Sequence, residues 1–289
     1  MKEFHHAHNI HVGQVVLNVS DLQHSLKFYT EVIGLRVLEE EARRASLTAD
    51  GQAPLLVLEQ PENVSKKQGR TTGLYHFALL VPSRRELADV FRHLLEVKWP
   101  LQGAADHFVS EAIYLADPDG NGIEIYSDRP AATWKWENGE VLMATEPLDY
   151  QHLLSEEAKE WSGMSEQTII GHIHLHVAEW PETEKFYCDG LGFEIVCRYG
   201  QQALFVSTAR YHHHIGLNTW NGLGAPAPAP ESVGLRYFTL IMPSVEKRTA
   251  VVQRLQSLGF PVTELDGRVV VEDPSGTAIH LLTYGEKVV

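Results

Sequence analysis

The 289-residue sequence contains very little cysteine, a deficit of basic residues and no long apolar run. Its two cysteines, Cys188 and Cys197, are too few for a disulfide framework, and we expect reduced thiols in the core of a cytoplasmic protein. Lysine and arginine number 24 against 38 acidic residues, giving a net charge of −14. Because no basic patch is present, nucleic acids and anionic membrane surfaces are not expected partners. We also expect neither a membrane span nor a signal peptide.

Histidine, by contrast, is abundant, with 16 residues, and 44% of the sequence is hydrophobic. A chain of this length and composition can form two ordinary domains, each with its own core. Four of the histidines, His5, His6, His8 and His11, form an N-terminal histidine-rich stretch that could bind adventitious metal. Several others fall in strand-like stretches, which makes them candidates for metal ligands or catalytic groups.

The sequence also repeats itself. Residues 12–35 align without a gap with residues 170–193, and both stretches read as a strand followed by an amphipathic helix. Residues 73–83 align in the same way with residues 234–244. The segment that begins at residue 73 and the one that begins at residue 234 each end with an Asp-Pro-x-Gly turn and a strand.

These repeats divide the chain into four strand–helix–strand–strand–strand (βαβββ) units, which we number one to four, at 10–60, 72–128, 169–220 and 232–285. Two units therefore lie in 10–128 and two in 169–285, and we expect residues 129–168 to form an ordered crossover between them. One such unit leaves a sheet face uncovered, so the units must pair around a cavity. The sequence predicts an α+β fold of four βαβββ units paired into two curved half-barrels.

One carboxylate has an unusual place in this pattern. Asp117-Pro-Asp-Gly-Asn predicts a tight turn, and Glu124 lies between two isoleucines in the strand that follows. Strand alternation puts Glu124 and Tyr126 on one face of that strand and the isoleucines on the other. Taken alone, Glu124 reads as a solvent-facing residue, but if it is buried it needs a partner.

Over nearly its whole length the chain resembles the glyoxalase, or vicinal-oxygen-chelate, superfamily. The resemblance is carried by the Phe-Tyr pairs at 28–29 and 186–187 with their Ile-Gly-Leu or Leu-Gly-Phe helix ends, and by the segment from Asp117 to Glu124. Within the superfamily the chain is most similar to type I extradiol ring-cleaving dioxygenases of the catechol 2,3-dioxygenase kind. The resemblance implies that metal ligands come from the first and last strands of the units.

The first-strand positions are Gln14, His76, His172 and Tyr237, and the last-strand positions are an apolar residue in unit one, then Glu124, Gly216 and His280. The resemblance therefore implies a metal site of His76, His172 and Glu124, the ligand composition of non-haem Fe(II) oxygenases, which Mn, Zn or Ni can also occupy. These ligands belong to units two and three. We predict that these two units share the active cavity, and that units one and four enclose a vestigial one, with His280 as a structural residue or part of a second metal site.

The family also places a histidine and a tyrosine ahead of the ligand glutamate, at positions that His107 and Tyr114 occupy here. The family also has an acid–base histidine at the start of the last strand of the partner unit. Motif alignment selects His213 for this role, whereas strict alternation from Gly216 would favour its two histidine neighbours. His214 is therefore kept as a candidate additional ligand or supporting group, and His174 is expected to support the ligands or to be simply buried.

The function that the resemblance implies is Fe(II)-dependent extradiol cleavage of a catechol ring by O₂ to a muconic semialdehyde, as part of aromatic catabolism. The expected partners are a small aromatic diol and O₂, and the exposed sheet edges of this fold would suit a homo-oligomer. Two alternatives stay open. One is a glyoxalase-like metal-dependent lyase or isomerase, and the other is a non-catalytic protein of the same fold that binds aromatic compounds.

Overall fold

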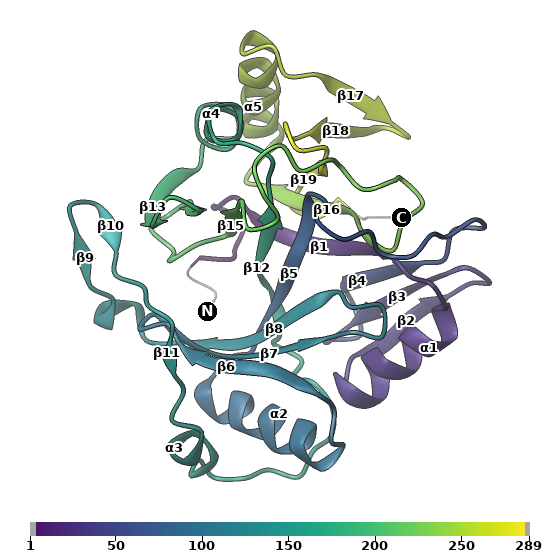
Figure 1. Cartoon of the computed structure of the whole chain (residues 1–289), viewed down its shortest axis with the longest axis vertical. Coiled ribbons are helices and arrows are strands. Elements are labelled where there is room, and N and C mark those ends of the chain that lie inside the picture. Colours follow the sequence, from purple (N-terminus) through teal and green to yellow (C-terminus); the bar gives the residue numbers. More distant parts are fainter. Residues whose placement is uncertain (1–3, 287–289) are drawn as a thin grey trace.

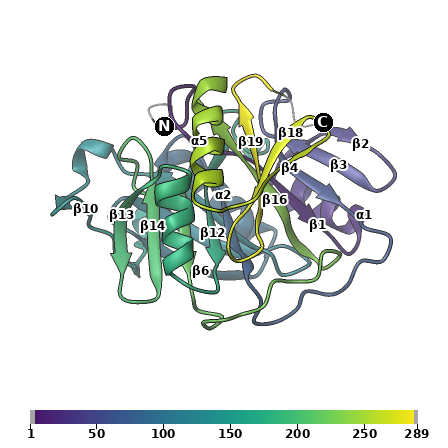
Figure 2. The same ribbon diagram turned by 90° about the horizontal axis from the view of Figure 1, so that it is seen from above.

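Two large mixed sheets dominate the computed structural model of the chain, which describes residues 4–286 (Figure 1). The sheets meet at their central strands, where β1 lies against β12 and β16 lies against β5. Figure 2 shows their outer strands on opposite sides of the molecule, with β13 and β14 at one side and β2 to β4 at the other. Within residues 4–286 no helix is long and apolar enough to cross a membrane.

The eight-stranded sheet is built from units one and four. Unit one contributes β1 (His11–Asn18), helix α1 (Leu22–Lys27) continuing into a π-helical turn (Phe28–Val32), β2 (Arg36–Glu40), β3 (Arg44–Thr48) and β4 (Pro54–Glu59). Unit four contributes β16 (Gly234–Met242), helix α5 (Val245–Ser257), β17 (Val262–Leu265), β18 (Arg268–Glu272) and β19 (Ala278–Thr283). The strand order is β17-β18-β19-β16-β1-β4-β3-β2, with β1 and β16 antiparallel at the centre.

The nine-stranded sheet is built mainly from units two and three. Unit two contributes β5 (Gly73–Leu80), helix α2 (Arg84–Glu96), β6 (Leu101–Asp106), β7 (Ser110–Ala116) and β8 (Gly122–Asp128). Unit three contributes β12 (Ile169–His176), helix α4 (Pro181–Glu184) continuing into a π-helical turn (Lys185–Gly190), β13 (Glu194–Tyr199), β14 (Ala203–Ser207) and β15 (Ile215–Asn218). The strand order is β11-β6-β7-β8-β5-β12-β15-β14-β13, with β5 and β12 antiparallel at the centre.

The segment between units two and three contains several short elements. They are a 3₁₀ turn (Ala131–Thr133), β9 (Trp136–Glu137), β10 (Glu140–Val141), β11 (Glu146–Pro147) and helix α3 (Tyr150–Leu154). The strand β11 extends the nine-stranded sheet at β6, and α3 packs on α2. Trp134 is buried and stacks on Phe4, so this segment also fixes the N-terminal residues against the sheet.

Two equivalent hydrogen bonds connect the sheets. The hydroxyl of Tyr29 in unit one donates to Asp117 in the Asp-Pro turn of unit two at 2.8 Å, and Tyr187 in unit three donates to Asp273 in the turn of unit four at 2.8 Å. Both tyrosines are fully buried, and burial raises the pKa of each well above 10, so they remain donors. The repeated Phe-Tyr pairs therefore pack in the core, as their spacing predicts.

Strand alternation positions the functional face of the nine-stranded sheet. Ile123 and Ile125 of β8 face the main hydrophobic core, and α2 packs on this side of β7 and β8. Tyr126 belongs to a separate cluster on the opposite face, together with Ala78 of β5. Glu124 lies on the same face as Tyr126 and is only 3% exposed, so it is a buried carboxylate and not a solvent-facing one.

Candidate metal centre

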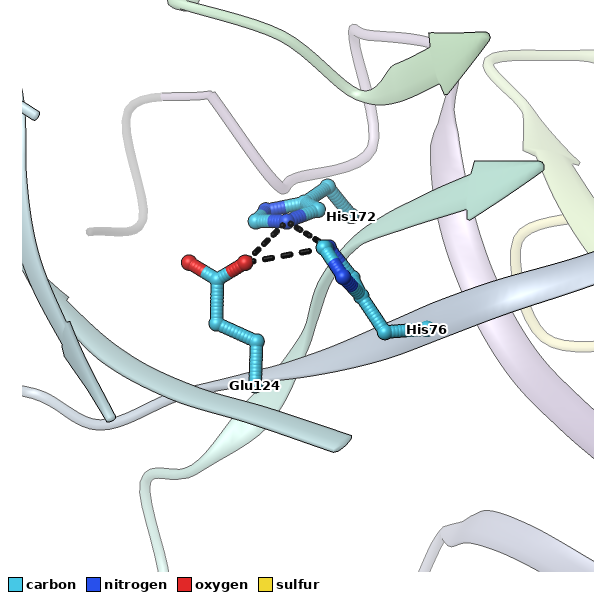
Figure 3. Close-up of side chains that lie close together, drawn as sticks. All are labelled: His76, Glu124 and His172. Atoms are coloured by element: carbon cyan, nitrogen blue, oxygen red, sulfur yellow. Dashed lines mark hydrogen bonds and ion pairs between the residues drawn. The ribbon is translucent and has the colours of Figure 1, made fainter. Parts of the chain in front are cut away.

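Three side chains converge on this face from three adjacent strands, His76 from β5, Glu124 from β8 and His172 from β12 (Figure 3). The register explains how they meet. Glu124 and His172 both lie opposite Ala78 of β5, one from each side, and His76 is two residues before Ala78 on the same face. The small side chain of Ala78 leaves the space above it for the three ligand groups.

The distances between the ligand atoms are short and nearly equal. His76 Nε2 lies 3.0 Å from Glu124 Oε2, His172 Nε2 lies 3.1 Å from the same oxygen, and the two Nε2 atoms are 3.3 Å apart. A metal bonded at about 2.1 Å, the length typical of zinc, separates neighbouring donors by about 3.0 Å in an octahedron and about 3.4 Å in a tetrahedron. The three side chains therefore fit a bound metal ion without rearrangement.

The charges at this centre also suit a cation. Burial opposes ionisation of Glu124, but the attraction and hydrogen bonds of His172 and His76 outweigh it and hold the pKa of the carboxyl well below 4.5. Burial lowers the pKa of His172 to about 4, against the attraction of Glu124. At neutral pH the carboxylate is thus ionised and the His172 imidazole is neutral, which are the forms that bind a metal. Among residues 4–286, no other group of three such side chains converges in this way.

His107 and Tyr114 lie together beside this centre. His107 donates from Nδ1 to the carbonyl oxygen of Ala144 at 2.6 Å, so its Nε2 accepts the hydroxyl proton of Tyr114 at 2.5 Å. Burial, followed by the charge of Glu124, raises the pKa of Tyr114 well above 10. Tyr114 therefore stays a neutral phenol.

His213 is the third candidate catalytic residue, and its ring lies beside the ligand His172, with centroids 4.1 Å apart. Burial and the neighbouring imidazoles, first His172 and then His212, hold the pKa of His213 well below 6.5. His212 is fully buried behind it, with Nδ1 2.8 Å from His213 Nδ1 and Nε2 2.8 Å from Asp128 Oδ1. Neither Asp128 nor a role for His212 behind His213 was anticipated from the sequence. Asp128 shares a strand face with Glu124 at period two, which is the signal that could have found it.

His214 does not contribute to the centre. Its Nδ1 is bonded by Ser207 and Thr208, and its Nε2 faces the carbonyl oxygen of Phe4, so both ring nitrogens are occupied away from Glu124. The structure therefore does not bring His214, the candidate additional ligand or supporting group, to this centre. The alternation that supported it does not apply, because β15 begins only at Ile215 and the preceding histidines lie outside the strand.

The remaining histidines occupy separate places. Asn218 Nδ2 lies 3.0 Å from His174 Nε2. The His174 ring fills the space beside Gly216, so that a Cβ added to Gly216 would lie 2.9 Å from the ring. His280 stacks on Tyr237 in the other sheet, with centroids 3.8 Å apart, and burial lowers its pKa to about 4. The N-terminal histidines belong to no convergent ligand group in residues 4–286.

A cavity of about 430 Å³ opens over the metal centre. Its polar end holds His76, Glu124, His107, Tyr114 and His213. Its remaining wall is mostly apolar or aromatic, with Tyr75, Ala104, Ala105, Val109, Met143, Tyr199, Phe205 and Trp220, and it also contains the polar residues Gln102, Ser110, Thr145 and His174. Within the part of the chain that the structure describes, no lysine or arginine lines this cavity.

Comparison with known proteins places this geometry in a family. The sequence model of the Glyoxalase/Bleomycin resistance protein/Dioxygenase superfamily matches residues 11–125 and 169–281, and each match covers two of the four units. The chain belongs to this superfamily. This superfamily member is 46% identical over 268 residues to catechol-2,3-dioxygenase of Bacillus subtilis strain 168, which is 91% of this chain and 94% of that protein. The likeness over nearly the whole length makes the chain a dioxygenase-type enzyme.

Solved structures show the same fold. A proposed dioxygenase from Bacillus subtilis superposes with a TM-score of 0.67 at 15% identity, covering 97% of this chain and 87% of that one. Glyoxalase I from Zea mays superposes with a TM-score of 0.59 at 16% identity, covering 95% of this chain and 92% of that one. The predicted superfamily and the α+β fold of four βαβββ units are therefore confirmed.

Proposed function

We propose that this enzyme uses Fe(II) to cleave catechols beside the hydroxyl pair, with O₂ as the oxidant and a muconic semialdehyde as the product. The observation that carries the proposal is the convergence of His76, His172 and Glu124 beside the polar end of the cavity. Two imidazoles and one carboxylate are the ligand set of non-haem Fe(II) oxygenases, and they leave positions open for other molecules. The catechol-2,3-dioxygenase that the chain matches over most of its length supports the same reaction.

Iron held by His76, His172 and Glu124 would supply Lewis acidity toward the diol and redox chemistry with O₂. In the ring opening, both atoms of O₂ enter the product and one ring carbon–carbon bond breaks. The role of the protein is to hold the diol at its polar end and to move its protons.

Three side chains perform this role in our proposal. His213 is neutral and buried at the site, so it can take a proton from the diol and return it to a reduced oxygen atom later. Tyr114 and His107 lie on the unit-two side of the same cavity, where the Tyr114 oxygen would accept a hydrogen bond from a substrate hydroxyl and so orient the diol. Because the Tyr114 proton is directed to His107, the tyrosine oxygen is fixed in orientation before substrate arrives.

The cavity wall limits the substrate further. It contains Val109, Met143 and Phe205, and among residues 4–286 it has no lysine or arginine that could pair with a carboxylate on the ring. A charged ring substituent would lose its hydration without gaining a partner, which is costly. We therefore propose that the enzyme prefers catechols with hydrogen or small apolar substituents to catechols that carry a carboxylate.

The decisive experiment is an anaerobic reconstitution of the purified protein with Fe(II), followed by addition of catechol and air. The expected result is O₂ uptake with formation of a yellow ring-fission product, faster for catechol or 4-methylcatechol than for 3,4-dihydroxybenzoate. Protein that contains one iron per chain yet cleaves none of these diols would overturn the proposal. Parallel incubation with a hemithioacetal substrate tests the glyoxalase-like alternative, and turnover there without O₂ uptake would establish it instead.

A further inference from the structure

A buried chain of hydrogen bonds runs away from the cavity behind His213. His213 lines the cavity, while His212 lies behind it and is completely buried. The Nδ1 atoms of the two rings are 2.8 Å apart, and the Nε2 atom of His212 lies 2.8 Å from Asp128 Oδ1. Asp128 is the last residue of β8, the same strand that carries Glu124, so units two and three join in this chain as well.

The direction of each hydrogen bond in the chain follows from Asp128. An ionised carboxylate can only accept, so His212 must carry its proton on Nε2. The same carboxylate oxygen also accepts the hydroxyl of Tyr211 at 3.1 Å. When His212 is neutral, its Nδ1 is then bare, and the donor in the short contact to His213 is the Nδ1 of His213. The nitrogen of His213 that remains, Nε2, has no proton.

We propose that Asp128 and His212 are positioning residues that hold His213 in the tautomer whose Nε2 lone pair is available to the cavity. This inference rests on the proposed function, in which His213 accepts a proton from the diol. A neutral imidazole has two tautomers, and the wrong one would present an N–H donor to the substrate where an acceptor is required. A carboxylate that fixes the tautomer of a catalytic histidine through its second nitrogen is an established device in enzymes, and here a second imidazole extends it by one step.

A purely structural role for these residues makes a different prediction. In that case the hydrogen bonds only support the segment before β15, and any lost bond in the network would have a similar effect. Tyr211 provides the matched control, because it is as buried as His212. Its hydroxyl forms hydrogen bonds with Asp128 and, at 2.6 Å, with Tyr126, but not with His213. The Tyr211→Phe variant removes hydrogen bonds from the network without interrupting the path from Asp128 to His213.

The test is nitrogen NMR of the imidazole rings in the full-length protein loaded with diamagnetic Zn(II), which distinguishes protonated from bare ring nitrogens without turnover. We expect His213 to be protonated at Nδ1 and bare at Nε2 in the wild type and in Tyr211→Phe. In His212→Phe we expect the proton to move to Nε2 in most molecules. His212→Asn, whose side-chain oxygen can replace the lost acceptor, should restore the Nδ1-protonated form.

Kinetics of the Fe(II) enzyme provide the second measurement. His212→Phe should lower kcat on the order of tenfold or more with little change in KM, and His212→Asn should recover part of the loss. A wild-type spectrum with the proton on Nε2, or a His212→Phe variant with unchanged tautomer and kcat, would overturn the inference. If His212→Phe does not fold, the wild-type spectrum alone decides. If the wild type cleaves no catechol, the proposed function fails, while the spectra still decide the role of Asp128 and His212.

Discussion

Replacing Glu124 by glutamine separates what this carboxylate does for the fold from what it does for a bound metal. Glu124 is 3% exposed and accepts hydrogen bonds from two imidazoles, at 3.0 and 3.1 Å. Hydrogen bonds to a charged group contribute about 1.5–3 kcal/mol each, whereas burying the charge costs several kcal/mol, so the two effects nearly cancel. Without metal, we expect the free energy of unfolding of the Glu124→Gln variant to differ from that of the wild type by no more than about 1.5 kcal/mol.

Adding metal should reveal the difference. A metal present at one hundred times its dissociation constant stabilises the folded state by about 2.7 kcal/mol. That corresponds to a rise in Tm of about 5 °C for a chain of this size. Glutamine is neutral and a poor ligand for a hard cation, so the variant should lose this rise together with its iron content and its activity.

The assay is thermal unfolding with and without Fe(II) under argon, together with iron analysis of the desalted protein. Glu111→Gln is the matched control, because Glu111 is also a buried carboxylate of unit two but pairs with Arg84, at 2.6 Å. It should lower Tm equally with and without metal and keep the metal-induced rise. A Glu124→Gln protein that retains the wild-type rise and iron content would refute the assignment of Glu124 as a ligand.

Three further predictions concern other parts of the molecule. His213→Ala should lower kcat by about 10²–10⁴-fold and still bind iron, since the proposed role of His213 is to move protons and not to bind the metal. Loss of iron binding would contradict this role. His280 has a folded pKa of about 4 against 6.5 unfolded, so its contribution to stability is present above pH 6.5 and is lost as pH falls toward 4. His280→Phe should therefore lose about 2 kcal/mol less than the wild type between pH 7 and pH 5 in urea unfolding, and an equal loss would show that another group is responsible. Gly171→Ala places a Cβ 1.9 Å from the Tyr126 hydroxyl and should lower the free energy of unfolding by about 3 kcal/mol. Gly69→Ala is the control, because a Cβ there has no atom within 4 Å, and its free energy of unfolding in urea should equal that of the wild type.

The sequence was most informative where physical constraints repeat along the chain. The gapless repeats are enough to place the first strand and helix of each unit, and the glycines at 34 and 192 take φ of +86° where those helices end. The composition of the ligand positions led to units two and three as the pair that shares a sheet, because only these units supply two imidazoles and a carboxylate. The structure brings His76, Glu124 and His172 together on that sheet.

The sequence was least informative where chain segments without regular structure meet. His212, His213 and His214 are adjacent in the sequence, yet one faces the cavity, one bonds Asp128 and one bonds the N-terminal residues. Periodicity cannot separate three residues that precede a strand. The N-terminal histidine-rich stretch gave no sign that Phe4 would pack on Trp134, because that contact depends on the crossover segment.

The order in which the units pair also sets the order in which the chain can fold during synthesis. The sheet with the metal centre comes from the contiguous stretch 72–220, so it can close before unit four leaves the ribosome. Unit one has no such neighbour in sequence, because β1 pairs with β16, whose residues are made after units two and three. The strand β1 must therefore keep an open edge until β16 is made, and chaperones that protect such edges would act on unit one and not on the sheet of units two and three.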